Sequence, residues 1–563
     1  MATRLESWHP SRRLRPLALS LSLAASLAAA AATLEPGRTV PAGPADGPAI
    51  QAPSGPDTPV GVALPYAGTP VDVLTYHYDA ARTGWNPAET ALTVASVQSG
   101  KFSLLATLAV DGEVFAQPLL VNAVTLADGT VHDLVVIATG KNSVYAFDAH
   151  SNALLWHVNL GTPQASADVG CSDVTTTYGI GSTPVVLRGG NKPPRLYVVD
   201  AIEPTRNEFH SRLHQLSLAD GHDLKTPVEI KPSAVLDDGN TISFDPHNQW
   251  VRAGLAANAG QLYLAVGSHC DHNPNNITGW LLRYDAVDLS LQSAFHTVDR
   301  KAGYELAAPW NSGFAPAVDD DGTVWFVTGN GDFKKGGKDW GESVLRLAPT
   351  GRKVADWFTP AAYDTLNGGD LDFGSGGVML LPPAPGQLAP PLAVAMGKDG
   401  TLYLLNRDKL GHVQAGDAGA LQATRVASSG RGVWGGPAYW LSPTGGIVYY
   451  QTSADVLKGY TVATGATPSL TQSMQGTTTS SNGGAMMVVT SSGSQAGTGV
   501  VWVVRRANPL VLEAYDAQRL GAPIWSGPAG NWSAGRPFVT PVAANGRVYV
   551  GGSGNVSVYG LTP

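Results

Sequence analysis

The sequence predicts an all-β protein, an eight-bladed β-propeller of four-stranded antiparallel blades closed by an N-terminal strand. The first observation behind this prediction is composition, because 66 glycines, 40 prolines and only 14% charged residues suit many short strands joined by tight turns. The second is repetition, since a unit of short β-type runs recurs from residue 113 onward. A length of 563 residues would otherwise suggest three or four domains, but repeats of this kind form one ring.

The N-terminal segment has the pattern of an export signal. Arg12 and Arg13 precede an apolar run over residues 17–32, whose Ala-rich end is typical of a cleavage site. The run is too short to span a bilayer. The arginine pair resembles the twin-arginine export pattern, so that route and the general secretory route both stay open. We therefore expect a signal peptide over residues 1–32 and a periplasmic or extracellular protein.

A linker and one repeat domain follow the predicted signal. Residues 33–70 are rich in Pro, Ala and Gly, which predicts a flexible linker without a core. Residues 71–563 are predicted to form the single propeller, with no transmembrane segment in the mature chain. The formal net charge is -8 and no Lys/Arg cluster occurs, which argues against nucleic acid or anionic lipid as a partner.

The clearest repeat unit contains four β-type runs. They are Glu113–Val121, Leu134–Thr139, Ser143–Ala149 and Ala153–Trp156. The D-G, G-K-N and D-A-H-S-N turns between them predict an antiparallel meander. Because a sheet of this size buries neither face alone, successive sheets must stack radially around an axis.

Seven variants of this unit follow along the chain. They begin near Gly179, Trp250, Trp310, Phe373, Val433, Gly483 and Phe538. The last unit supplies only three strands, whereas Lys101–Ala109 has strand character and no sheet of its own. We therefore predict that Lys101–Ala109 completes the last blade and leaves no open sheet edge.

Four polar residues stand just beyond short β-type runs between residues 323 and 408. They are Asn330, Asp370, Asp372 and Lys398. Strand ends of repeated sheets converge on one face, where binding sites are commonly built. Each residue also has a plainer interpretation: a turn residue for Asn330, loop carboxylates or a structural calcium clip for the aspartates, and a hairpin turn for Lys398.

The repeat resembles that of a known family. The run A-F-D-A-H-S-N-A-L-L-W over residues 146–156 is echoed by A-Y-D-A-Q-R-L-G-A-P-I-W over residues 514–525. Both are similar to the repeat of pyrroloquinoline-quinone (PQQ) propellers, in which the tryptophan docks one blade on the next. The segment Y-H-Y-D-A-A-R-T-G-W-N-P over residues 76–87 resembles the entry segment of that family. Catalytic and non-catalytic propellers share this repeat.

The resemblance to alcohol-oxidising quinoproteins implies roles for three of the polar residues. It implies that Asn330 is a calcium ligand, that Asp372 is the catalytic base and also contacts the metal, and that Lys398 lies beside the quinone oxygens. Calcium polarises the quinone, a carboxylate takes the hydroxyl proton, and an ammonium group stabilises charge on the reduced ring. The implied cofactors are PQQ and calcium.

Other positions of the family's site are filled differently here. Its second calcium ligand is a glutamate, whose nearest counterpart in this chain is Asp271. Its aromatic platform beneath the quinone is a tryptophan, for which Trp310 and Phe314 are both candidates. The vicinal disulfide of many members cannot form, because Ser172 follows Cys171.

The chain contains two cysteines, Cys171 and Cys270. Exported proteins with two cysteines more often pair them than leave them free. The repeat count places both in loops of adjacent blades. We therefore predict a Cys171–Cys270 disulfide.

Two classes of function stay open at this point. The first is a PQQ-dependent dehydrogenase that oxidises alcohol or aldehyde groups of a small-molecule or polymer substrate in the central funnel. It would need a separate electron acceptor, since the sequence has no C-x-x-C-H haem motif. The second is a non-catalytic scaffold that binds a protein, peptide or polysaccharide through its loops. The retained Asn330, Asp372 and Lys398 favour the first, and the altered stacking positions favour the second.

Overall fold

The computed structural model describes residues 66, 68–189, 192–271, 277–299, 306–532 and 538–563. The predicted signal peptide and nearly all of the predicted linker lie outside these residues. Almost all regular structure is β, as the composition predicts. None of the described helices is both long enough and apolar enough to cross a membrane.

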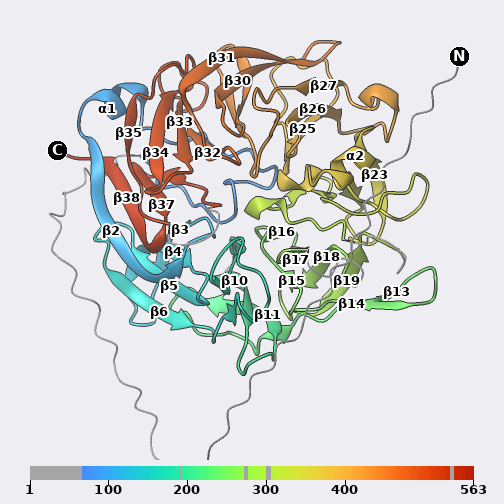
Figure 1. Cartoon of the computed structure of the whole chain (residues 1–563). Helices are drawn as coiled ribbons and strands as arrows, with labels where there is room; N and C mark the ends of the chain where they lie inside the picture. Colours follow the sequence, from blue (N-terminus) through green and yellow to red (C-terminus); the bar gives the residue numbers. More distant parts are fainter. Residues whose placement is uncertain (1–65, 67, 190–191, 272–276, 300–305, 533–537) are drawn as a thin grey trace, which may run out of the picture. The chain divides into compact units, whose positions relative to one another are not determined.

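Eight sheets follow one another around a centre and are numbered here as blades 1–8 in chain order (Figure 1). Blade 1 contains β3 Leu119–Thr125, β4 Val131–Ala138, β5 Ser143–Asp148 and β6 Leu154–Asn159. Blade 2 contains β9 Val185–Gly189, β10 Lys192–Ile202, β11 His210–Ser217 and β12 Val228–Glu229. Blade 3 contains β15 Gln249–Trp250, β16 Ala256–Asn258, β17 Gln261–Ser268, β18 Trp280–Asp285 and β19 Leu291–His296. Blade 4 contains β20 Ala317–Val318, β21 Val324–Val327, β22 Val344–Leu347 and β23 Val354–Phe358.

The second half of the ring continues in the same way. Blade 5 contains β24 Val378–Leu380, β25 Leu392–Met396, β26 Thr401–Asn406 and β27 Gln422–Arg425. Blade 6 contains β28 Ala438–Ser442, β29 Gly445–Gln451, β30 Val456–Ala463 and β31 Ser469–Thr479. Blade 7 contains β32 Ala485–Thr490, β33 Val500–Arg505, β34 Val511–Asp516 and β35 Trp525–Pro528, with β1 Trp85–Asn86 parallel to β32. Blade 8 contains β36 Val542–Ala544, β37 Arg547–Gly551, β38 Ser553–Leu561 and β2 Phe102–Glu113.

The remaining elements are short. Two small hairpins pair β7 Gln164–Ala165 with β8 Thr177–Tyr178, and β13 Ser233–Val235 with β14 Thr241–Ser243. Within the described residues, the helical segments are α1 Val94–Gln98, α2 Tyr363–Gly368 and the 3-10 turns η2 Asn311–Gly313, η3 Phe373–Ser375 and η4 Ala415–Asp417.

The ring closes through its N-terminal strand, as the incomplete last repeat predicts. Strand β2 pairs antiparallel with β38, and Phe102 lies opposite Leu561 at one end of the ladder. Figure 1 shows the blue strand β2 beside the red strand β38. This pairing joins the two ends of the repeat region and removes an exposed sheet edge.

Tryptophans fasten neighbouring blades to one another. The Trp156 indole of blade 1 donates a hydrogen bond to the Leu218 carbonyl of blade 2 at 2.9 Å. Its ring packs on Gly221, where a Cβ would come within 2.8 Å of the ring. The equivalent Trp525 packs edge-on against Phe102 in blade 8, with 4.9 Å between ring centroids. The docking role that the repeat implies for tryptophan is therefore present at both positions.

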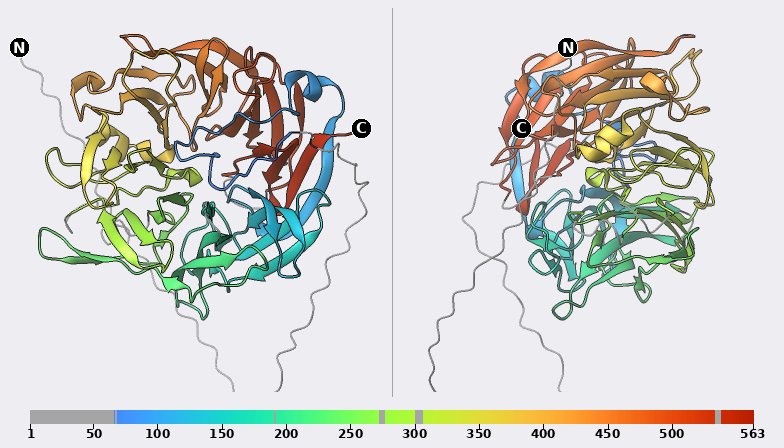
Figure 2. Two further views of the ribbon diagram at one scale, coloured as in Figure 1. Left: turned by 180° about the vertical axis from the view of Figure 1, so that it is seen from behind. Right: turned by 45° about the vertical axis from the view of Figure 1, so that its right-hand side comes forward.

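The segment over residues 73–86 runs along the first strands of the blades. Its backbone bonds to β3, β9, β20, β24, β28 and β32 in turn, for example from Val318 N–H to the Ala80 carbonyl at 2.8 Å. The buried Arg82 guanidinium donates to the carbonyls of Tyr76, Asp79 and Pro316. Figure 2 shows this blue segment crossing the middle of the ring. Through these bonds the segment ties together the inner strands whose ends carry the site.

Candidate functional site

One cavity of about 460 Å³ gathers most of the polar residues that the sequence singles out. Asp271, Asn330, Asp372 and Lys398 line it, and so does Trp310. These residues belong to blades 3, 4 and 5 and to the connections between them. The structure thus brings them together, while their chemical roles stay predictions.

The antiparallel meander explains why these residues meet. The residue before the first strand of a blade and the residue after its second strand lie at the same end of the sheet. Asn330 follows β21 and Lys398 follows β25, which are second strands. Trp310 and Asp372 precede β20 and β24, which are first strands. All four therefore reach the same face of the ring.

Two glycines allow these loops to approach closely. A Cβ at Gly329 would lie 2.3 Å from Asp372 Oδ1, and a Cβ at Gly397 would lie 2.5 Å from the Phe373 Cα atom. Both distances are far inside van der Waals contact, so larger residues would push the loops apart. The glycines of T-G-N and M-G-K thereby bring Asn330 and Lys398 up to Asp372.

Asp372 is the centre of the hydrogen-bond network. It is 2% exposed, and its Oδ1 accepts the Asn330 backbone N–H at 2.9 Å and the Trp310 indole N–H at 3.2 Å. Its Oδ2 lies 2.5 Å from Lys398 Nζ. Two donors therefore hold Oδ1, and Oδ2 depends on a single cation.

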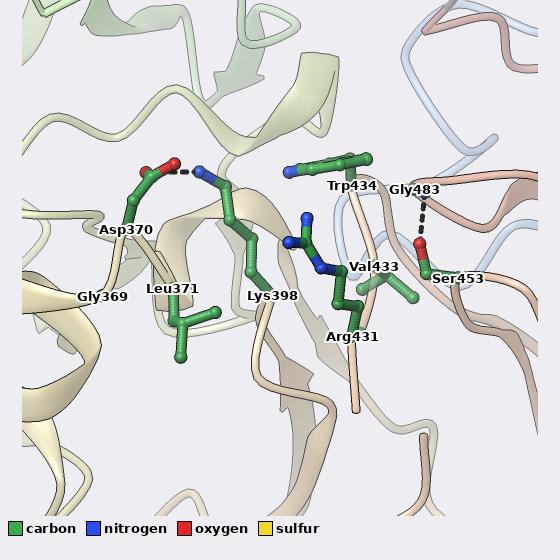
Figure 3. Close-up of a pocket in the computed structure, with 10 residues that line it drawn as sticks. Gly369, Asp370, Leu371, Lys398, Arg431, Val433, Trp434, Ser453 and Gly483 are labelled. Carbon is green, nitrogen blue, oxygen red and sulfur yellow. Dashed lines mark hydrogen bonds and ion pairs between the residues drawn. The ribbon is translucent and has the colours of Figure 1, made fainter. Parts of the chain in front are cut away.

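Lys398 bridges two carboxylates. Its Nζ also lies 2.7 Å from Asp370 Oδ1 (Figure 3), and that oxygen accepts a second bond from Asn330 Nδ2 at 3.0 Å. Burial alone would lower the pKa of Lys398, but the negative charges of Asp372 and Asp370 outweigh it and raise the pKa. Lys398 is therefore a cation at neutral pH. It also lines a smaller adjoining recess of about 90 Å³ with Arg431 and Trp434.

The oxygen atoms of the cavity suit a hard cation. Asn330 is 5% exposed, and its Oδ1 has no hydrogen-bond partner among the described residues. An amide oxygen left unpaired in this way keeps its lone pairs for a ligand. The carboxylates of Asp372 and Asp271 line the same cavity, and carboxylate and amide oxygens are the ligands that calcium prefers. These three residues have the chemistry to bind a calcium ion, although the described part of the chain contains no group of three or more His, Cys, Asp or Glu placed to hold a metal ion.

Asp271 carries a charge that its surroundings disfavour. Its carboxylate accepts a hydrogen bond from the Ser268 hydroxyl. Burial raises the pKa of Asp271, and the negative charge of Asp372 raises it further. A bound cation would relieve this repulsion.

The structure separates the two aromatic candidates for the platform. Trp310 lines the cavity, with Lys398 Nζ 5.6 Å from its ring centroid. Phe314 is fully buried in the core and makes edge contacts with Tyr76 at 5.2 Å and His77 at 5.0 Å. Only Trp310 of the pair therefore offers a surface to a ligand in this cavity.

The predicted disulfide is present and borders the site. Cys171 and Cys270 are bonded, with 5.7 Å between their Cα atoms. Cys171 lies in the loop between β7 and β8, and Cys270 follows β17 and lines the cavity beside Asp271. The cross-link therefore anchors the loop that carries a candidate metal ligand.

Known structures share this architecture at low sequence identity. The quinohemoprotein alcohol dehydrogenase ADHIIG from Pseudomonas putida HK5 matches with a TM-score of 0.55 and 13% identity, over 87% of this chain and 80% of that one. The quinohemoprotein alcohol dehydrogenase from Comamonas testosteroni gives 0.55 and 14%, over 88% and 81%. A europium-containing methanol dehydrogenase gives 0.55 and 13%, over 88% and 98%. In fold, this chain is similar to quinoprotein alcohol dehydrogenases. No family model and no curated protein sequence matches it.

Two buried charged residues at the site, Arg252 and Glu342, were not predicted from the sequence. Arg252 lies between β15 and β16, is 7% exposed and lines the cavity. Glu342 precedes β22 and accepts the Phe373 backbone N–H at 2.6 Å. Burial, and then the negative charge of Asp372, raise the pKa of Glu342 well above its usual value. Arg252 stands before the β16–β17 hairpin of blade 3, just as Trp310 and Asp372 stand before the first strands of their blades. This shared position in the repeat could have predicted that Arg252 reaches the same face.

Proposed function

We propose that this protein is an exported, quinoprotein-like dehydrogenase that oxidises alcohol or aldehyde groups in the cavity around Asp372. The observation that carries the proposal is the convergence of Asn330, Asp372 and Lys398 with Asp271 and Trp310 on one cavity. The shared fold of the dehydrogenases named above supports it.

The residues present would hold both cofactors. Asn330 Oδ1 and the carboxylates of Asp271 and Asp372 would bind calcium, and Trp310 and Lys398 would contact the PQQ ring. When bound, PQQ would supply the hydride acceptor for the substrate carbon, and calcium would supply a Lewis acid beside it. A separate acceptor would then receive the electrons.

Asp372 Oδ2 is the atom that would accept the substrate's hydroxyl proton. Oδ1 already holds two donors, whereas Oδ2 is paired with Lys398 alone among the residues that the structure describes. Lys398 keeps a second partner in Asp370, so it can leave Oδ2 without losing all its pairing. Loss of the hydroxyl proton to Asp372 and of the C–H hydride to the oxidant leaves a carbonyl product.

The experiment is a titration of the purified protein with PQQ and calcium, followed by thermal unfolding and by reduction of an artificial dye with alcohols and aldehydes. We expect both cofactors together to raise Tm and to permit dye reduction. Asp372→Asn should lower the rate about 10²- to 10⁴-fold, as loss of a general base does. Asp320→Asn is the matched control, because that exposed turn residue lies outside the cavity.

The other class of function makes the opposite prediction. A non-catalytic scaffold that binds a protein, peptide or polysaccharide through its loops would show no Tm shift with PQQ and calcium and no dye reduction with any substrate. That pair of results would refute the dehydrogenase proposal.

A further inference from the structure

Arg252 is a buried cation without a polar partner. It is 7% exposed, and its guanidinium makes no hydrogen bond or ion pair with any described residue. Other buried arginines are satisfied: Arg82 donates to three carbonyls, and Arg506 donates to the Trp434 carbonyl. Burial lowers the pKa of Arg252 to about 10, which still leaves it charged at neutral pH. An unpaired buried charge is destabilising, so its presence calls for a partner that the described residues do not supply.

Aromatic rings hold the Arg252 side chain in place. Its guanidinium carbon lies 4.8 Å from the Trp310 ring centroid, 4.9 Å from that of Phe538 and 5.8 Å from that of Trp250. Contacts with ring faces fix the guanidinium but use none of its five N–H donors. The group is therefore positioned while its hydrogen-bonding capacity stays available to the cavity that it lines.

We propose that Arg252 is an anion-recognition residue and that the cavity takes a small hydroxycarboxylate, with the carboxylate on Arg252 and the hydroxyl group toward Asp372. A planar guanidinium matches a carboxylate through two parallel hydrogen bonds. The placement of the hydroxyl rests on the proposed function, whereas carboxylate binding by Arg252 does not.

The charges around the cavity favour a ligand with one negative charge. In the protein without cofactor, Lys398 is paired with Asp370 and Asp372, so its charge is already balanced by two carboxylates. Asp271 and Asp372 line the same space and, without a bound cation, would repel a dianion more strongly than a monoanion. Arg431 is exposed and therefore hydrated, which leaves Arg252 as the buried cation that a monocarboxylate would meet.

The test measures binding to the full-length mature protein without added cofactor. Glycolate and lactate are compared with their neutral counterparts ethylene glycol and 1,2-propanediol, and with inorganic phosphate, by calorimetry and thermal unfolding. We expect the two carboxylates to bind and to raise Tm, and the diols and phosphate to do neither. Arg252→Gln should weaken glycolate binding about tenfold to a hundredfold. Arg252→Lys should give an intermediate affinity, because it keeps the charge and loses the two-point geometry.

A second arginine serves as the control. Arg346 also lies over a tryptophan, 5.4 Å from the Trp325 centroid, but it pairs with Asp321 at 2.8 Å outside the cavity. Arg346→Gln should leave glycolate affinity unchanged. A purely structural role for Arg252 predicts a lower Tm for Arg252→Gln, whereas release of an unpaired charge predicts a Tm that is unchanged or higher without ligand.

Several results would overturn the inference. These are equal shifts with glycolate and ethylene glycol, binding of phosphate without binding of glycolate, or full glycolate affinity in both Arg252 variants. Glycolate binding that requires Arg252, in a protein that never responds to PQQ and calcium, would refute the proposed function and leave this inference standing. Dye reduction with PQQ and calcium but no carboxylate binding would support the proposed function and refute this inference.

Discussion

Blade 2 and the central cavity both bury charged groups, and they treat them in opposite ways. In blade 2 the fully buried Asp200 carboxylate lies 2.5 Å from Arg212 Nη2 and 3.0 Å from His214 Nε2. The second His214 nitrogen lies 3.0 Å from Asp223. Every side chain of this cluster thus has a charged partner within the blade.

The cavity instead contains polar atoms without hydrogen-bond partners among the described residues. Within the part of the chain that the structure describes, Asn330 Oδ1 and the Arg252 guanidinium have no hydrogen-bond partner. Asp271 and Asp372 lie close enough to repel each other. Closed networks stabilise a fold, whereas open groups reduce stability until a ligand satisfies them. The contrast indicates a structural role for the blade 2 cluster and supports the proposal that the cavity takes a ligand.

The largest stability effect should come from breaking the closed cluster. Asp200→Asn removes the charge that faces Arg212 and His214, and loss of one partner of a buried ion pair costs about 3–5 kcal/mol. Urea unfolding at pH 6 measures it. Asp223→Asn is the control and should cost less, because the Asp223 side chain is 30% exposed. An Asp200→Asn loss below about 1 kcal/mol would mean that blade 2 does not depend on this network.

Loss of the disulfide should have the next largest effect on stability. The Cys171–Cys270 bond anchors a loop that lines the cavity. Replacing both Cys171 and Cys270 by serine opens a loop of 99 residues and should cost about 2–4 kcal/mol. Chemical reduction of the wild-type protein should give the same loss in urea unfolding. Equal stability of the reduced and oxidised forms would contradict this expectation.

Local signals in the sequence were enough to predict the propeller architecture and its closure. The missing strand of the last unit predicts the β2–β38 pairing, because a four-stranded blade needs an edge partner from elsewhere. The tryptophan of the first unit predicts the contact of Trp156 with blade 2. The small hairpins β7–β8 and β13–β14 were not predicted, since they interrupt the repeat with short strands of two or three residues.

The site could be predicted only where it follows the repeat. Asn330, Asp372 and Lys398 stand at strand ends, so the repeat alone places them on one face. The choice between Trp310 and Phe314 depends on the entry segment, whose Tyr76 and His77 contact Phe314 from far away in sequence. Such tertiary contacts leave no spacing signal in the chain.

The pH dependence of blade 2 sharpens the comparison. Burial by itself lowers the pKa of His214, but the hydrogen bonds that its ring N–H groups donate to the Asp200 and Asp223 carboxylates outweigh it and raise the pKa above the usual 6.5. The imidazolium therefore contributes its full stability below pH 6.5, and this is lost as pH rises through the folded value. One proton gives a slope of at most about 1.4 kcal/mol per pH unit. In urea unfolding from pH 5 to 9, His214→Gln should remove this component, and an unchanged slope would contradict it.

The smallest stability effect should fall on the residue that the proposed chemistry needs most. Asp372→Asn is the same chemical change as Asp200→Asn, but asparagine keeps the Oδ1 that accepts from Trp310 and the Asn330 backbone. The lost ion pair leaves Lys398 with Asp370, and the lost charge relieves repulsion of Asp271. These effects offset, so urea unfolding without cofactor should show a change below about 1 kcal/mol. A loss as large as that of Asp200→Asn would make Asp372 part of a closed structural network, and the distinction between the two clusters would then fail.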